Sequence, residues 1–202
     1  MPTDDYLALL AFAGALSFTP GPNTTLAAAL GANHGLARAL RFCLAVPVGW
    51  VLMLLAVSFG LAGLLAAVPA LAVAIKAVGL AYLLWLAWRL LGVRTLGSAD
   101  AERLRVGFWQ GVALQFVNIK AWMAAFTVSA AWIVPALAEG RIATRLAVVL
   151  PTMMAFAFAS NGSYALLGAA LRGWLAQGAR LRVFNAVMAA LLVATAAWMA
   201  AA

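Results

Sequence analysis

Six long apolar segments dominate this 202-residue chain and constrain its fold more than any other feature. Hydrophobic residues make up 67% of the chain and charged residues 9%, a composition that a water-soluble domain of this size cannot bury. A membrane-spanning helix needs roughly 20 apolar residues, so each segment is long enough to cross a bilayer once. We therefore predict an all-α polytopic membrane protein of about six transmembrane helices, forming one domain over residues 1–202 and surrounded by lipid. The apolar runs cover residues 5–31, 42–68, 69–92, 106–137, 143–171 and 182–201.

The second and third runs are almost continuous, and only Pro69 marks a boundary between them. A single helix over both would be far longer than a bilayer is thick. Proline is also a strong turn former, so we place the end of the second helix just before Pro69.

Basic residues lie mainly in the short connections between runs. The chain carries a net charge of +8, which in a soluble protein would suggest nucleic acid, but clustering in connections is typical of membrane topology signals. The connections on the opposite side of the membrane hold only Arg141 and Arg145. The positive-inside rule then predicts a multi-pass protein of the bacterial inner membrane with both termini outside the cytoplasm. Nine arginines fall in the connections between helices 1–2, 3–4 and 5–6: Arg38, Arg41, Arg89, Arg94, Arg103, Arg105, Arg172, Arg180 and Arg182.

A weak internal repeat relates the two halves of the chain. Residues 15–18 read Ala-Leu-Ser-Phe and residues 113–116 read Ala-Leu-Gln-Phe, and in both the second and the fifth run an arginine precedes a proline by six residues. A weaker match joins Ile-Lys-Ala-Val at 75–78 to Phe-Asn-Ala-Val at 184–187. An odd number of helices per repeat turns the second copy upside down. We therefore predict two inverted three-helix repeats, about 1–97 and about 98–202, packed around a pseudo-twofold axis.

The first run is interrupted by two prolines around a glycine. Proline lacks an N–H and breaks the helical hydrogen-bond ladder, and lipid cannot satisfy the freed groups, so the break must face a cavity. The half-helix after it would point its first N–H groups and its positive dipole end at that cavity, which suits a carboxylate. We name Thr19, Pro20, Gly21, Pro22 and Asn23 as candidate substrate-binding residues.

Lys120 lies about 15 residues into the fourth run, beside Asn118. An ionisable side chain at membrane depth suggests function, although lysines also extend from helix ends towards the interface. We expect Lys120 to act as a counter-charge for a substrate carboxylate or as a group that takes up and releases protons. Asn161, Tyr164 and Tyr82 are further candidates for the cavity wall, although each could equally form an interhelical hydrogen bond.

Three segments resemble the signatures of one family. Residues 18–24, Phe-Thr-Pro-Gly-Pro-Asn-Thr, followed by Gly31 and Gly35, resemble the first-helix signature of the LysE/RhtB amino-acid exporters. Residues 115–122 resemble the family's Asn-Pro-Lys-Ala segment, and residues 76–83 its third-helix pattern of Lys, Gly and then Tyr-Leu. Ile119 stands where the family usually has proline, so a break in the fourth helix stays open.

The resemblance covers essentially the whole chain and implies a secondary transporter that exports amino acids or close derivatives, driven by the proton gradient. Its partners would be a small amino-acid substrate, protons and lipid, with no nucleic acid and no cofactor. Gly60, Gly63 and the small residues of the last run would suit a homodimer face. The functional positions that it implies are Pro20, Gly21, Pro22, Asn23, Asn118 and Lys120.

A divalent metal-ion exporter is the alternative, since related families with three-plus-three helices carry such ions. Metal transport would require acidic, histidine or cysteine ligands at membrane depth, and the single histidine and cysteine do not form such a set. We likewise expect no enzyme, because no nucleophile stands near a base in the sequence. Without an acidic residue at membrane depth, the proton that drives transport would be carried by Lys120, by the substrate or by the N-terminal aspartates. The same absence leaves no partner for a cationic side chain, so we expect neutral or small polar substrates rather than lysine or arginine. All five acids lie in the N-terminal tail or in connections: Asp4, Asp5, Asp100, Glu102 and Glu139.

Overall fold

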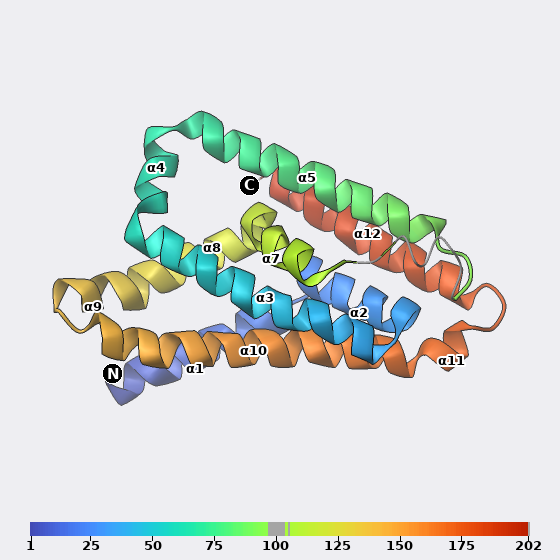
Figure 1. Ribbon diagram of the computed structural model, residues 1–202, viewed down its shortest axis with the longest axis horizontal. Helices are drawn as coiled ribbons and strands as arrows, with labels where there is room; N and C mark the ends of the chain where they lie inside the picture. Colours follow the sequence, from blue (N-terminus) through green and yellow to red (C-terminus); the bar gives the residue numbers. More distant parts are fainter. Residues whose placement is uncertain (97–103, 105, 202) are drawn as a thin grey trace.

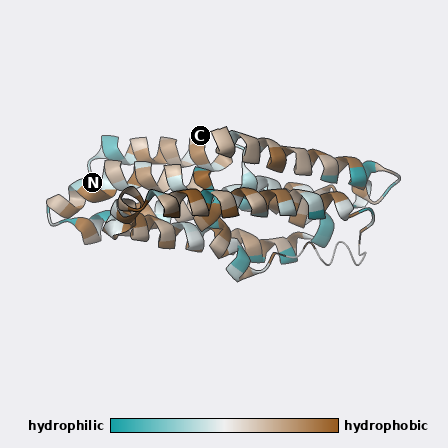
Figure 2. Ribbon diagram, turned by 90° about the horizontal axis from the view of Figure 1, so that it is seen from above, coloured by the Kyte–Doolittle hydropathy of each residue, from teal (hydrophilic) through white to brown (hydrophobic). Residues whose placement is uncertain are grey.

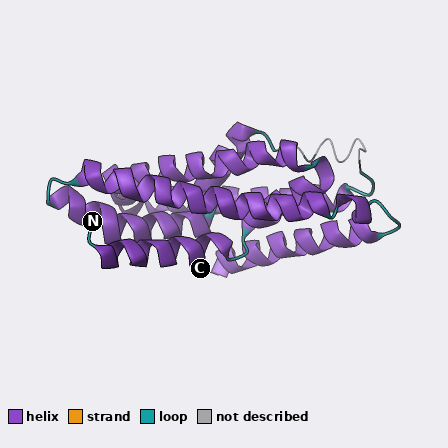
Figure 3. Cartoon of the chain, turned by 90° about the horizontal axis from the view of Figure 1, so that it is seen from below, coloured by secondary structure: helices purple, strands orange, loops and turns teal. Residues whose placement is uncertain are grey.

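The computed structural model describes residues 1–96, 104 and 106–201, and in these ranges the chain forms helices and no strand (Figure 1). This confirms the predicted all-α class. Short loops join the helices at the two ends of the bundle (Figure 3). The elements are α1 (Thr3–Phe18), α2 (Pro22–His34), α3 (Leu36–Ala56), the π-helical turn η1 (Val57–Leu61), α4 (Ala62–Ala67), α5 (Pro69–Gly92), α7 (Phe108–Val117), α8 (Ile119–Val128), the π-helical turn η2 (Ser129–Ile133), α9 (Val134–Ala138), α10 (Ile142–Ala170), α11 (Arg172–Leu175) and α12 (Arg180–Ala201).

Five helical stretches within the described residues are long and apolar enough to cross a membrane. Most of the ribbon is apolar along the helices, and polar residues gather towards the turns (Figure 2). The first apolar run is divided into α1 and α2, of 16 and 13 residues, and neither half alone reaches the roughly 20 residues of a full crossing. A sixth crossing made by α1 and α2 together stays a prediction. The five stretches are Leu36–Ala67, Pro69–Gly92, Ile119–Ala138, Ile142–Ala170 and Arg180–Ala201.

The helices pack in pairs that would suit a twofold relationship. The second and fifth predicted helices, α3 and α10, are in contact, and so are the third and sixth, α5 and α12. Equivalent helices meet each other in this way when they lie beside a pseudo-twofold axis. The arrangement is compatible with inverted repeats, which remain a prediction.

Glycines allow the helix backbones to approach closely. A Cβ atom at Gly31 of α2 would overlap the carbonyl oxygen of Ala165, and one at Gly168 of α10 would overlap that of Ala28. Small residues at helix interfaces are the usual means of close packing in membrane proteins. They hold α2 in the centre of the bundle, where most of its residues are buried.

Pro69 lies in the first turn of α5, where a missing N–H leaves no helical hydrogen bond unmade. The predicted boundary between the second and third runs is therefore confirmed. Upstream, η1 contains Gly60 with φ of 130°, a conformation that only glycine adopts readily, and the chain kinks there before α4.

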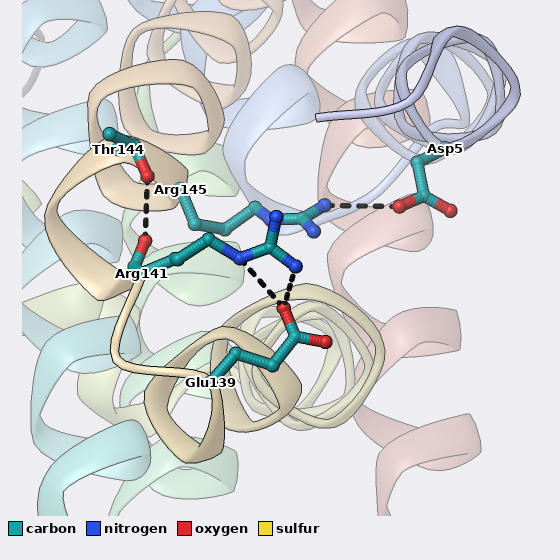
Figure 4. A network of polar contacts seen from close by, with 5 residues as sticks. All are labelled: Asp5, Glu139, Arg141, Thr144 and Arg145. Atoms are coloured by element: carbon teal, nitrogen blue, oxygen red, sulfur yellow. Dashed lines mark hydrogen bonds and ion pairs between the residues drawn. The ribbon is translucent and has the colours of Figure 1, made fainter.

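The two ends of the bundle differ in charge. One end carries the α2–α3 turn, the end of α5, α11 and the start of α12 (right in Figure 1), with seven of the nine predicted cytoplasmic arginines. Arg103 and Arg105, like Asp100 and Glu102, lie outside the described residues. At the other end, Arg145 of α10 lies 3.2 Å from Asp5 of α1, and Arg141 pairs with Glu139 (Figure 4). The orientation of the termini stays a prediction.

Candidate functional site

The first predicted helix is broken between Phe18 and Pro22. Gly21 is extended, its N–H donates to the Thr24 hydroxyl at 3.0 Å, and its carbonyl accepts the N–H of Thr25 at 3.0 Å. Pro22 has no N–H. Since the first donors of a helix have no carbonyl one turn earlier, the amides of Asn23 and Thr24 are left for other partners.

The carbonyl groups at the end of α1 are bonded by side chains. The Ser160 hydroxyl donates to the Ser17 carbonyl at 2.6 Å, and the Tyr164 hydroxyl donates to the Phe18 carbonyl at 3.2 Å. The Thr19 hydroxyl and amide both donate to the Ala15 carbonyl. The acceptors that the break releases are thus satisfied mainly from α1 and α10, which fixes α1 against α10.

The fourth predicted helix is also broken, at Asn118, with α7 ending one residue before it and α8 beginning one residue after. The Asn118 side-chain oxygen accepts the N–H of Lys120 at 3.1 Å, the arrangement of a helix N-cap. The presence of Ile119 in place of proline therefore does not prevent the break, because an asparagine cap supplies an alternative partner for the freed amide.

Two sets of side-chain hydrogen bonds, called ties below, join the two helix breaks to each other. The Lys120 side-chain nitrogen donates to the Thr19 carbonyl at 2.7 Å. The Asn23 side-chain nitrogen donates to the Gln115 side-chain oxygen at 2.8 Å, and the Gln115 side-chain nitrogen donates back to the Asn23 side-chain oxygen at 3.2 Å. Gln115 is fully buried and also donates to the Gly111 carbonyl at 3.0 Å, which fixes its orientation.

Between the two breaks lies a cavity of about 70 Å³. One water needs about 10–15 Å³ on this scale, so the cavity has room for several waters or a small solute. A more open and largely apolar hollow of about 630 Å³ lies beside it, bordered by α1, α8 and α12, and shares Lys120 with it. The cavity is lined by Leu16, Ser17, Thr19, Gly21, Pro22, Asn23, Thr24, Val46, Trp50, Gln115, Asn118, Lys120, Ala121, Ala124, Met153, Ala157 and Asn161.

Seven of the ten sequence-predicted site residues line this cavity, namely Thr19, Gly21, Pro22, Asn23, Asn118, Lys120 and Asn161. Pro20 borders the neighbouring hollow instead. Tyr164 is not among the lining residues, and its hydroxyl is used by the end of α1. Tyr82 is not among them either, because α5 packs against α12, and its ring stacks on Trp85 at 5.5 Å.

Gln115 is a polar cavity residue that is absent from the sequence-based candidates, as are Ser17 and Thr24. Its one signal is the internal repeat, in which it occupies the place of Ser17, a residue that also lines the cavity. Ser160 was missed as well, because a serine in an apolar helix carries no indication of the side on which it lies.

The cavity combines amide groups with one positive side chain. Among the described residues that line it, Lys120 is the single ionisable one. Lys120 and the N-terminus of α2, which carries a partial positive charge, border the same space. This electrostatic environment suits a carboxylate.

Comparison with known proteins found a family model and several curated relatives. The model described as LysE type translocator matches residues 14–201. A protein of Klebsiella pneumoniae subsp. pneumoniae named cysteine/O-acetylserine efflux protein is 32% identical over 92% of both chains. One of the same name from Salmonella paratyphi A is 36% identical, over 59% of this chain and 60% of the relative, and one from Escherichia coli K12 is 29% identical over 88% of both. No solved structure matches.

Proposed function

The chain belongs to the LysE type translocator family, and on this basis we propose that it exports small amino acids or close derivatives from the cytoplasm across the bacterial inner membrane. The observation that carries the proposal is the cavity between the two helix breaks. Membership of the family also confirms the resemblance drawn from the three sequence signatures.

The substrate carboxylate docks at the start of α2. The amides of Asn23 and Thr24 have no helical acceptor, and a helix N-terminus stabilises a bound anion through these donors and through its dipole. Lys120 stands at the same cavity and supplies the positive charge. A carboxylate there would compete with the Thr19 carbonyl for the lysine nitrogen.

The substrate side chain is small and uncharged. The rest of the wall is uncharged and includes the apolar residues Val46, Trp50 and Met153, and the lining described above contains no acidic residue that would pair with a cationic side chain. The named relatives are cysteine/O-acetylserine efflux proteins, and both of those molecules have compact, uncharged side chains. Cysteine and O-acetylserine are therefore the first candidates.

Transport is coupled to protons through alternating access. The two ties between the breaks, Lys120 to Thr19 and Asn23 to Gln115, connect the predicted first repeat to the second. Rocking of one repeat against the other requires these ties to change, and a carboxylate that takes Lys120 from Thr19 releases one of them. Lys120 is also the cavity residue that can exchange a proton.

The test is an efflux assay in vesicles loaded with each of the twenty standard amino acids and with O-acetylserine. We expect export of cysteine, O-acetylserine and other small neutral amino acids in the presence of a proton gradient, and loss of export when an ionophore dissipates it. Export of no tested compound would overturn the proposed function, whereas export that ignores the ionophore would overturn the proton coupling alone.

A further inference from the structure

Asn161 of α10 lines the cavity and carries a hydrogen-bond acceptor without a partner among the described residues. The residue is only 4% exposed. Its side-chain nitrogen donates to the Ala157 carbonyl at 2.8 Å, one turn earlier on α10. Its side-chain oxygen is buried and has no hydrogen-bond partner in the described structure.

The orientation of this amide follows from its neighbour. Rotating the group by half a turn would place the Asn161 oxygen against the carbonyl oxygen of Ala157, so that two acceptors would face each other. The nitrogen therefore stays on Ala157, and the oxygen is the atom left over. A buried acceptor without a partner is destabilising, and such groups are rare unless a water, an ion or a ligand supplies the donor.

The ends of two half-helices give the same cavity opposite partial charges. α1 ends with Ser17 and Thr19 at the cavity wall, and α2 begins there with Asn23 and Thr24. A helix is negative at its carbonyl end and positive at its amide end. The Ser17, Phe18 and Thr19 carbonyls are already bonded by side chains, so the α1 end contributes only its partial negative charge. The Asn161 side-chain oxygen is the acceptor left for a cationic group.

We propose that the Asn161 side-chain oxygen accepts a hydrogen bond from the α-ammonium group of the substrate. This inference rests on the proposed function and adds a second point of recognition, opposite in sign to the α2 amides and Lys120. The transporter then selects molecules with both a carboxylate and a free amino group, and it rejects des-amino analogues of the same size and side chain.

The experiment compares export of cysteine with export of 3-mercaptopropionate, which lacks only the amino group. Hydrogen bonds to charged groups contribute about 1.5–3 kcal/mol, so the wild-type protein should prefer cysteine by about tenfold or more in transport efficiency. In Asn161→Leu this preference should collapse to less than about threefold, through a raised KM for cysteine. Ser163→Ala changes an exposed position on the same helix and should leave the ratio unchanged.

A second variant separates recognition from packing. Asn161→Asp keeps an acceptor at the same place and should retain the preference for cysteine. It also tests the proposal if Asn161→Leu does not fold. This inference alone would be overturned if the wild-type protein exports cysteine and Asn161→Leu keeps the wild-type preference for cysteine over 3-mercaptopropionate. It would also be overturned if folded Asn161→Asp loses that preference. If the wild-type vesicles export no amino acid at all, the proposed function fails together with it.

Discussion

The side-chain nitrogen of Lys120 lies 2.7 Å from the main-chain carbonyl oxygen of Thr19, so a residue at the second helix break caps the end of the half-helix at the first. A positive group is favourable there, because the carbonyl end of a helix carries partial negative charge. The contact links two positions about a hundred residues apart in the sequence. It gives Lys120 a partner in the absence of substrate, and that partner can be exchanged for a carboxylate.

Replacing Lys120 with methionine should reduce amino-acid efflux by at least about tenfold, because the cavity loses its positive charge and its tie to the first break. Thr19 lines the cavity, so water there can donate to its carbonyl and the fold should change little in stability. The matched control is Lys76→Met, which removes a half-buried lysine of α5 away from the cavity lining. Equal efflux in the two variants, at equal amounts of protein in the membrane, would contradict the role of Lys120.

The reciprocal amide pair gives a second prediction. Gln115→Leu leaves the Asn23 side chain without its donor and its acceptor, and should destabilise the protein by about 1–3 kcal/mol in detergent unfolding experiments. Gln110→Leu on the same helix removes a hydrogen bond at the exposed start of α7 and should cost less. In the double variant Asn23→Ala with Gln115→Leu, the loss should be smaller than the sum of the single losses. Additive losses would show that the pair contributes no coupling.

The sequence was sufficient for the helical class and for the break at Pro20–Pro22. Apolar run length and the missing N–H groups of proline are local properties, and they act in the same way whatever the tertiary arrangement. Pro69 was placed correctly for the same reason. The break at Asn118 does not follow from the sequence in the same way, because an asparagine cap depends on a single side-chain hydrogen bond rather than on a residue that cannot continue a helix.

The faces of the helices could not be predicted. In a chain this rich in alanine and leucine, most helices are apolar on all sides, and no polar stripe indicates which side meets the cavity. Residue type alone therefore predicts Tyr82 and Tyr164 as wall residues, and the structure places neither in the lining. Gln115 was overlooked although it is fully buried, because its role depends on Asn23, a residue from the other half of the chain.

The close approach of α2 and α10 should be sensitive to a single methyl group. In Gly31→Ala the new Cβ would overlap the carbonyl oxygen of Ala165, so the helices must separate, at a cost of about 1–3 kcal/mol. Gly162→Ala on α10 meets open space and should be neutral or slightly stabilising. Thermal unfolding in detergent measures both. Equal melting temperatures would contradict the packing of α2 against α10.

The membrane orientation can be tested by cysteine labelling, because the chain has one cysteine and it is fully buried. In a Cys43→Ala background, Glu139→Cys places a thiol at the bundle end beside Arg141, and Ala179→Cys places one at the arginine-rich end before α12. Both positions are exposed.

A membrane-impermeant maleimide should label Glu139→Cys in intact cells whose outer membrane has been made permeable, and should label Ala179→Cys only after the inner membrane is opened. The physical reason is that arginine-rich connections stay on the cytoplasmic side during insertion, so the end with Arg172, Arg180 and Arg182 should face the cytoplasm. Because α1 begins, and α12 ends, away from the arginine-rich end of the bundle, this pattern would place the two termini outside. The reverse pattern would place them in the cytoplasm, and the Asp5–Arg145 contact would then lie at the cytoplasmic end of the bundle rather than at the outer one.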